Sequence, residues 1–112
     1  MALRRSLPAL LALAVLAAPG MALAQAQSND PSFRLNNRGQ VTIREVYVSS
    51  SNDQNWGPDR LGREVLAPGR SVTIRLPRGQ CLNDIRLVFE NGQSQERRRL
   101  NTCQFTELNV PQ

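Results

Sequence analysis

The sequence predicts an all-β domain, a small two-layered β-sandwich, and three observations lead to this fold class. Apolar residues recur at every second position rather than at helical spacing, which is typical of half-buried strands. These runs are short, and clusters of Gly, Pro and Asn separate them at intervals of about 8 to 12 residues. The chain of 112 residues leaves room for one small domain. We therefore expect a sandwich of six to seven strands, with an open barrel as the alternative.

The first strand is expected to begin after Ser32. Phe33 and Leu35 form its inward-facing pair, because residues two apart on a strand lie on the same face. The following run, 36–39, reads Asn-Asn-Arg-Gly, which is the composition of a turn. The sequence therefore predicts that this strand ends before residue 36.

The second strand contains one irregularity. Its apolar alternation breaks at Arg44-Glu45 and then resumes on the same face, so one extra residue has been inserted. A β-bulge is the usual form of such an insertion. Tyr47 is expected to lie on the opposite face. The residues predicted to point inward are Val41, Ile43, Val46 and Val48.

The remaining strands follow from the same pattern. Asn91-Gly92 is the strongest hairpin signal in the chain, and a return strand is expected over 93–102. Pro and Gly flank the third strand on both sides, which indicates turns there. The strand order is expected to be Ig-like or of a related Greek-key kind. The inward residues of the third, fourth and last strands are Val72, Ile74 and Leu76, then Ile85, Leu87 and Phe89, then Phe105, Leu108 and Val110.

The first 24 residues have the pattern of a secretory signal peptide: a short cationic start, an apolar run and small residues at the cleavage position. Cleavage after Ala24 or after Ala26 fits the sequence. Pro8, Pro19 and Gly20 bound an apolar stretch too short for a stable membrane anchor. We expect a flexible tail over 25–31, a folded domain over 32–112, and a periplasmic or secreted location. The leader leaves open whether the general secretory or the twin-arginine route is used.

Cys81 and Cys103 are the two cysteines of the chain. An even number of cysteines in a short exported chain indicates a disulfide bond. No Cys-x-x-Cys spacing and no histidine are present to activate a thiol, so a redox or catalytic pair is not expected. Two buried free thiols are the alternative.

The composition excludes several kinds of chemistry. The chain contains no histidine, and all 14 of its basic residues are arginine. Imidazole bases, histidine-ligated metals and Schiff-base lysines are therefore excluded. No cofactor motif is present, so we expect no cofactor and no catalytic residues. The alternative is a small enzyme, or an enzyme accessory domain, that works through carboxylates near Trp56.

Four runs of the chain carry a resemblance to known proteins. They are 41–49 (VTIREVYVS), 55–62 (NWGPDRLG), 65–69 (VLAPG) and 81–86 (CLNDIR). In this order they resemble a group of small exported proteobacterial proteins of unknown function, often labelled Tat pathway signal proteins. The similarity covers nearly all of 33–110. It implies a compact exported β domain and brings no established catalytic residues with it.

The longest stretch without alternation, 49–61, is a candidate ligand loop. Loops at the end of a sandwich commonly carry function. Their oxygen atoms could hold a calcium ion or line a ligand groove. They could also make only local turn hydrogen bonds while the tryptophan covers the core. The candidate residues are Asn52, Asp53, Trp56, Asp59 and Arg60.

The run Glu96-Arg97-Arg98-Arg99 is the one charge run of the expected folded part. On a regular strand, Arg97 and Arg99 share one face, while Arg98 shares the other with Glu96 and Leu100. Arg97 and Arg99 are thus a candidate anion surface, and the alternative is a charged edge strand that prevents aggregation. Asp84 is expected to cap a turn, or to pair with Arg86 or another arginine across the sheet.

These observations favour a non-enzymatic binding module of the cell envelope. Without the leader, twelve arginines stand against nine acidic residues, a net charge of +3. Guanidinium groups pair well with phosphate and carboxylate. The expected partner is another envelope protein or an anionic envelope polymer. Nucleic acid is not expected, because the few aromatic residues do not alternate with the arginines.

Overall fold

The computed structural model describes residues 28–111, so the expected signal peptide and the first part of the expected tail lie outside the described residues. Within 28–111 the chain forms six strands and one 3-10 turn, which confirms the all-β prediction. No helix in this range is long and apolar enough to span a membrane. The elements are β1 (Phe33–Asn37), β2 (Ile43–Ser50), β3 (Ser71–Ile74), β4 (Leu82–Phe89), β5 (Ser94–Asn101), η2 (Thr102–Gln104) and β6 (Glu107–Val110).

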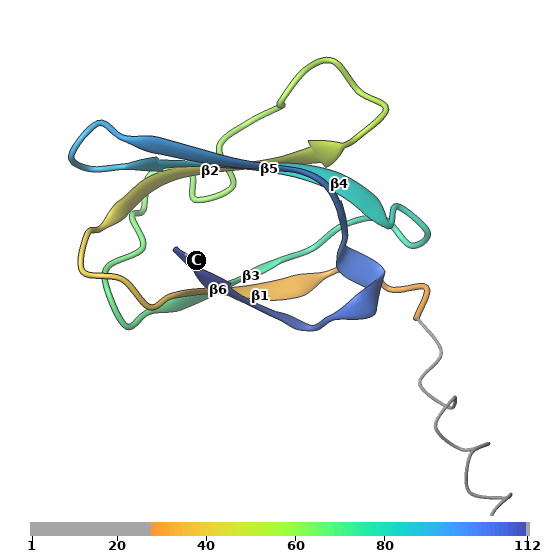
Figure 1. The fold of residues 1–112 in the computed structure, drawn as a ribbon, viewed down its shortest axis with the longest axis horizontal. Coiled ribbons are helices and arrows are strands. Elements are labelled where there is room, and N and C mark those ends of the chain that lie inside the picture. The colour runs from red at the N-terminus through yellow and green to blue at the C-terminus, as the bar shows by residue number, and fades with distance from the viewer. Residues whose placement is uncertain (1–27, 112) are drawn as a thin grey trace, which may run out of the picture.

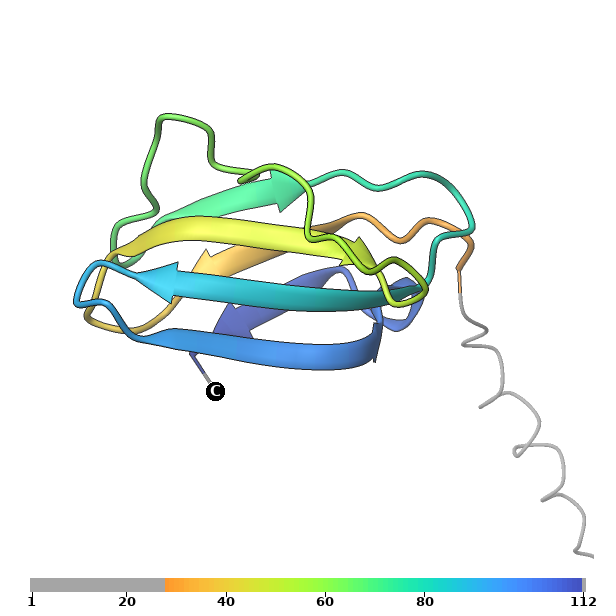
Figure 2. The same cartoon turned by 90° about the horizontal axis from the view of Figure 1, so that it is seen from above.

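The strands form two separate three-stranded sheets that lie one above the other (Figure 1). One sheet has the order β3-β1-β6, and the other has the order β2-β4-β5. β1 pairs antiparallel with β3 and parallel with β6. β4 pairs antiparallel with β2 and with β5. Figure 2 shows the two sheets from above, with β5 along one edge of its sheet. The layered arrangement replaces the open-barrel alternative.

The core lies between the two sheets, and the predicted period of two supplies it. Residues two apart on each strand point to the same face, so each sheet presents one apolar face to the other. The side chains that are most completely buried include Leu35, Ile43, Val46, Ile74, Ile85 and Val110.

The predicted bulge in β2 is confirmed. The register with β4 shifts between Ile43 and Glu45, so Arg44 is the extra residue. Tyr47 lies opposite Arg86 on the outer face and donates a hydrogen bond to Glu45 Oε1 (2.7 Å). The bulge explains how the inward side chains stay in phase on both sides of the break.

The turn predicted at 36–39 is wrong in its first half. Asn36 and Asn37 belong to β1 and are buried. Asn37 donates its side-chain amide to Val41 O (3.0 Å) and to Leu66 O (2.9 Å), and its Oδ1 accepts from Gly39 N (3.0 Å). The buried amide of Asn37 thus has three hydrogen-bond partners, as buried polar groups usually do. Composition alone does not reveal such partners.

Three apolar positions differ from the expected strands. Val41 is 36% exposed and precedes β2, because the chain is still bending there. Leu76 is buried but lies beyond the end of β3. Phe105 lies before β6, half-buried, with its ring edge-on to Phe33 at 5.8 Å between centroids. The core therefore also uses side chains from the ends of strands.

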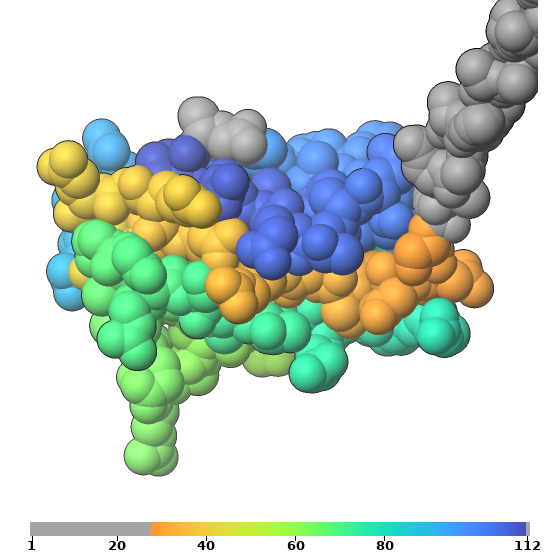
Figure 3. Space-filling model, turned by 90° about the horizontal axis from the view of Figure 1, so that it is seen from below, coloured from red at the N-terminus to blue at the C-terminus, as the bar shows by residue number. Residues whose placement is uncertain are grey.

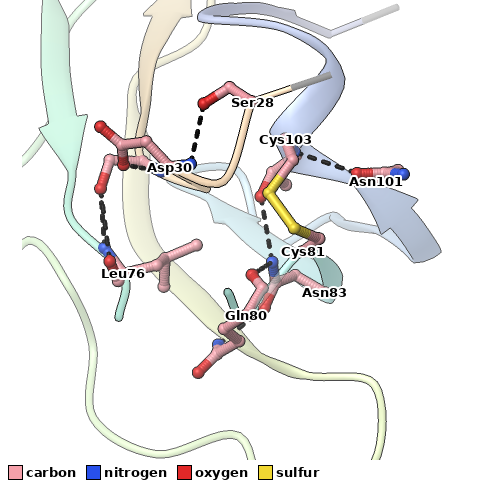
Figure 4. The surroundings of a disulfide bond; sticks show 10 residues. Ser28, Asp30, Leu76, Gln80, Cys81, Asn83, Asn101 and Cys103 are labelled. Carbon is pink, nitrogen blue, oxygen red and sulfur yellow. Dashed lines mark hydrogen bonds between the residues drawn. A yellow bond between two sulfur atoms is a disulfide. The ribbon is translucent and has the colours of Figure 1, made fainter. Parts of the chain in front are cut away.

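The disulfide between Cys81 and Cys103 is confirmed, with an S–S distance of 2.08 Å and a Cα–Cα distance of 5.1 Å. Cys81 precedes β4, and Cys103 lies in η2 between β5 and β6. The bond therefore ties one sheet to the segment that enters the other (Figure 4).

The amino-terminal end of the described chain packs beside this disulfide. Ser28 N donates to Cys103 O (3.3 Å), and Gly79 N donates to Asn29 O (3.0 Å). Pro31 is among the fully buried residues. These contacts extend the folded part to Ser28, four residues before the boundary that the sequence predicted.

Candidate functional site

The candidate ligand loop is held to the body of the domain by two of its five candidate residues. Asp59 Oδ1 accepts from Val46 N (2.9 Å) and from Leu61 N (3.0 Å). Arg60 donates through its Nη1 to Arg75 O (3.1 Å). Both side chains therefore support the loop structurally.

Asn52 and Asp53 lie at the exposed start of the loop. Asn52 N donates to Ser50 Oγ (3.2 Å), and Asp53 N donates to Ser50 O (2.9 Å). These are local turn contacts. Residues 28–111 contain no group of three His, Cys, Asp or Glu side chains placed to hold a metal ion. The contacts match the turn alternative for this loop better than the calcium alternative.

One interpretation of the sequence places Trp56 as a cover over the core. The structure differs, because Trp56 contacts Arg98 instead. Its ring lies over the guanidinium group of Arg98, with Arg98 Cζ at 5.0 Å from the ring centroid. Arg98 belongs to β5. The tryptophan therefore lies against the outer face of the β2-β4-β5 sheet, where a cation–π contact replaces apolar packing.

Arg98 joins two carboxylates beneath this ring. Its Nη1 lies 3.0 Å from Asp84 Oδ2, and its Nη2 lies 2.9 Å from Glu96 Oε1. Glu96 also lies 3.9 Å from Arg86 Nε. We call this outer face of the β2-β4-β5 sheet, with Trp56, Asp84, Arg86, Glu96 and Arg98, the paired face. The prediction that Asp84 pairs with an arginine across the sheet is confirmed, and the partner is Arg98 rather than Arg86.

Asp84 is the most constrained carboxylate of the paired face. Its side chain is 7% exposed, and it accepts hydrogen bonds from Ser51 Oγ (2.8 Å) and Arg99 N (2.9 Å) in addition to Arg98. Burial alone would raise the pKa of Asp84, but these three hydrogen bonds outweigh it, so the pKa is lowered from 3.8. The Glu96 and Asp84 carboxylates raise the pKa of Arg98. Asp84 is thus an ionised, fully partnered group.

A second bulge corrects the predicted placement of the arginine run. Ile85 pairs with Arg97 and Asn83 pairs with Leu100, so Arg98 and Arg99 together oppose Asp84. Arg99 has a φ of +56°, and its amide reaches Asp84 because of this bend. Arg97 lies on the inner side with Ile85, and Leu100 packs against the core. Arg97 and Arg99 therefore do not share one face, and the expected anion surface is not formed by this pair.

The outer face of the β3-β1-β6 sheet carries a polar hollow of about 360 Å³ that sequence reasoning missed. We call it the arginine hollow. Figure 3 shows this side of the molecule, with β6 in blue beside β1. Three arginines line it together with Asn36, Ser71 and Glu107: Arg34 in β1, Arg38 directly after β1, and Arg70 directly before β3.

Asn36 forms the floor of the arginine hollow and is 7% exposed. Its amide nitrogen donates to Glu107 Oε1 (2.8 Å) and to Asn109 Oδ1 (2.9 Å). Its Oδ1 accepts from Ser71 Oγ (2.5 Å) and from Arg34 Nε (3.4 Å). One asparagine therefore fixes side chains from all three strands of the sheet. Its outward position on the first strand follows from alternation, but the composition of 36–39 indicates a turn instead.

The fold and these two faces define a small disulfide-bonded, two-sheet β domain with charged outer surfaces. No protein-family model, no curated protein and no solved structure matches the chain. A functional conclusion must therefore rest on the geometry of the chain's own residues.

Proposed function

We propose that the protein is an exported, non-enzymatic binding module of the cell envelope that contacts an anionic envelope polymer. The observation that carries the proposal is that most arginines of the domain form no ion pair within the described residues. Four of the twelve arginines in 28–111 form ion pairs within this range, and eight do not. Because arginines also outnumber acidic residues, the surface keeps guanidinium groups available for an external anion.

The carboxylates argue against the enzyme alternative. Asp59 accepts one backbone amide from β2 and one from its own loop, and Asp84 is occupied by three donors. General acid–base catalysis needs a carboxyl group that reaches the substrate and changes its protonation state near the working pH. An ionised, buried Asp84 with a lowered pKa is poorly suited to this role.

Export is supported by three separate features. The first 24 residues have the pattern of a signal peptide. The disulfide indicates an oxidising compartment such as the periplasm or the extracellular space. The resemblance to small exported proteobacterial proteins points the same way. We propose a periplasmic or secreted location on these grounds.

The sheet orders support an Ig-like arrangement. The β2-β4-β5 sheet has the chain order of the three-stranded C-F-G sheet of Ig domains, with β1 and β3 in the places of strands B and E. β6 lies beside β1, where an Ig domain carries its first strand, but it comes from the other end of the described chain. We propose an Ig-like sandwich in which the carboxyl-terminal strand takes that position.

The test is binding to a polyanion at two salt concentrations. The purified protein is titrated with dextran sulfate and with uncharged dextran, at 50 mM and at 500 mM NaCl. We expect binding to dextran sulfate alone, weakened at least tenfold at the higher salt because exposed charges are screened. Equal affinity for both polymers, or no binding to either, would contradict the proposal. A pull-down from envelope extract at the same two salt concentrations tests the alternative partner, another envelope protein.

A further inference from the structure

We infer that the arginine hollow is a binding site for a phosphate group carried by a sugar. The inference rests on the proposed function and narrows it to one place and one ligand chemistry. It starts from the strand register. Asn36 pairs with Ser71 across antiparallel β1 and β3, so the end of β1 and the start of β3 lie together. Arg38 and Arg70, one residue beyond each strand, are thereby placed on the same hollow.

Backbone hydrogen bonds hold these two segments together. Asn37 N donates to Arg70 O (3.0 Å), and Gly69 N donates to Asn37 O (2.7 Å). The site therefore rests on paired backbone at the end of a sheet, with the Asn36 floor beneath it. Such a preorganised setting lowers the cost of ordering side chains on binding.

The charges of the hollow are unbalanced. Glu107 is its one acidic residue, and that carboxylate already lies 3.6 Å from Arg34 Nε and accepts the Asn36 amide. Arg38 and Arg70 form no ion pair within 28–111. Two guanidinium groups without an acidic partner suit a phosphate, whose several oxygens can accept from both, better than a single carboxylate.

The other residues that line the hollow indicate which chemical group carries the phosphate. Ser71 Oγ donates to Asn36, so its oxygen is left to accept a hydrogen bond from a ligand hydroxyl. The lining contains no aromatic or large apolar side chain. A hollow of about 360 Å³ is in the lower range of small-ligand sites and is large enough for one sugar. A hydroxyl-rich, phosphorylated saccharide therefore fits these groups.

The experiment measures the affinity of the purified protein for glucose 1-phosphate, inorganic phosphate and glucose by calorimetry. The variant is R38Q/R70Q. The matched control is R63Q/R75Q, which removes the same charge from two arginines that do not line the hollow. We expect glucose 1-phosphate to bind most tightly, R38Q/R70Q to weaken it at least tenfold, and the control to stay within twofold. Amide circular dichroism verifies that both variants are folded.

A second arm separates two sources of the same chemistry. Vesicles of phosphatidylcholine with and without lipid A present sugar phosphate on a membrane, while glucose 1-phosphate presents it in solution. A tenfold loss with R38Q/R70Q in either arm supports the inference, and the arm with the tighter binding identifies the source. An equal loss in both variants in both arms, or no binding in either arm, overturns it. Dextran sulfate binding that persists in those cases leaves the proposed function intact, and its absence removes both.

Discussion

The two outer faces of the sandwich use arginine in opposite ways. On the paired face, Arg98 is held between Asp84 and Glu96 beneath Trp56, so every charge there has a partner from the same chain. In the arginine hollow, Arg38 and Arg70 share a polar floor but have no acidic partner within 28–111.

The difference shows that counting arginines does not locate a binding surface. In the run of three consecutive arginines, Arg98 forms ion pairs with carboxylates of the same chain, and Arg97 lies on the inner side of the sheet. The two arginines of the hollow that have no acidic partner within 28–111, Arg38 and Arg70, come from two separate segments of the chain. What separates structural from available charge is the distribution of carboxylates, because each buried carboxylate must be paired.

The largest effect on stability should come from removing the disulfide between Cys81 and Cys103. The variant C81S/C103S loses the closure of a 22-residue loop, which is worth about 3 kcal/mol. Urea unfolding is measured by circular dichroism and by Trp56 fluorescence. We expect both signals to shift together to lower urea, because the two sheets share one core. Unchanged unfolding after reduction of the wild-type disulfide would contradict this role.

Asp84 tests the paired face alone. The change Asp84→Asn should lower the free energy of unfolding at pH 7 by about 1 to 3 kcal/mol, because hydrogen bonds to a buried charge are lost. The matched control is Asp53→Asn, an exposed loop carboxylate, with an expected change below about 0.5 kcal/mol. Urea unfolding measures both variants. Similar losses in the two variants would show that Asp84 has no special structural role.

The acid limb of the stability curve gives a second readout of Asp84. Its pKa is lowered in the folded protein, so its contribution is fully present above the unfolded value near 3.8 and is lost as the pH falls through the folded value. Wild-type stability should therefore decline more steeply below pH 3.8 than that of Asp84→Asn. Parallel curves for the two proteins would contradict the hydrogen-bonded, ionised state of this carboxyl.

Trp56 tests a weaker contact of the same face. Replacing it with Leu removes the ring over Arg98, which is worth about 0.5 to 1 kcal/mol at a partly exposed site. Trp56→Phe keeps an aromatic face and should lose less. Urea unfolding by circular dichroism measures both. Equal losses in the two variants would mean that packing, rather than the cation–π contact, holds the loop.

The smallest effect on stability is expected in the arginine hollow. R38Q/R70Q should change the free energy of unfolding by less than about 0.5 kcal/mol, because these side chains form no ion pair within 28–111. Urea unfolding at 50 mM and 500 mM NaCl measures it. A loss comparable to that of Asp84→Asn would show that the arginines are structural, and the contrast between the faces would disappear.

The layers of this fold could be predicted because they depend on local alternation. The period of two identified the inward side chains of β1, β2 and β4, and the break at Arg44 marked a bulge. The second bulge left no such signal. Arg98 and Arg99 are both polar, so no apolar residue shows the change of phase there.

The candidate sites depend on contacts between residues far apart in the chain, and the sequence pattern predicts few of these contacts. Asp84 could be matched with an arginine in general terms, but Trp56 over Arg98 spans two unrelated segments. The arginine hollow requires the β1–β3 register, which alternation does not fix. The sequence indicates a turn at Asn36 and Asn37, because a buried asparagine is recognised only by the partners around it.

The parallel pairing of β1 with β6 determines when the domain can be completed. Residues 34–37 pair with residues 107–110, so one edge of β1 has no strand partner until nearly all of the chain to Val110 has been synthesised. Cys103 also emerges late, close to β6. Pairings between such distant segments form slowly, because the closure entropy of the intervening chain must be overcome first. In a chain of this topology, the sheet β3-β1-β6 is therefore among the last parts of the domain that can form.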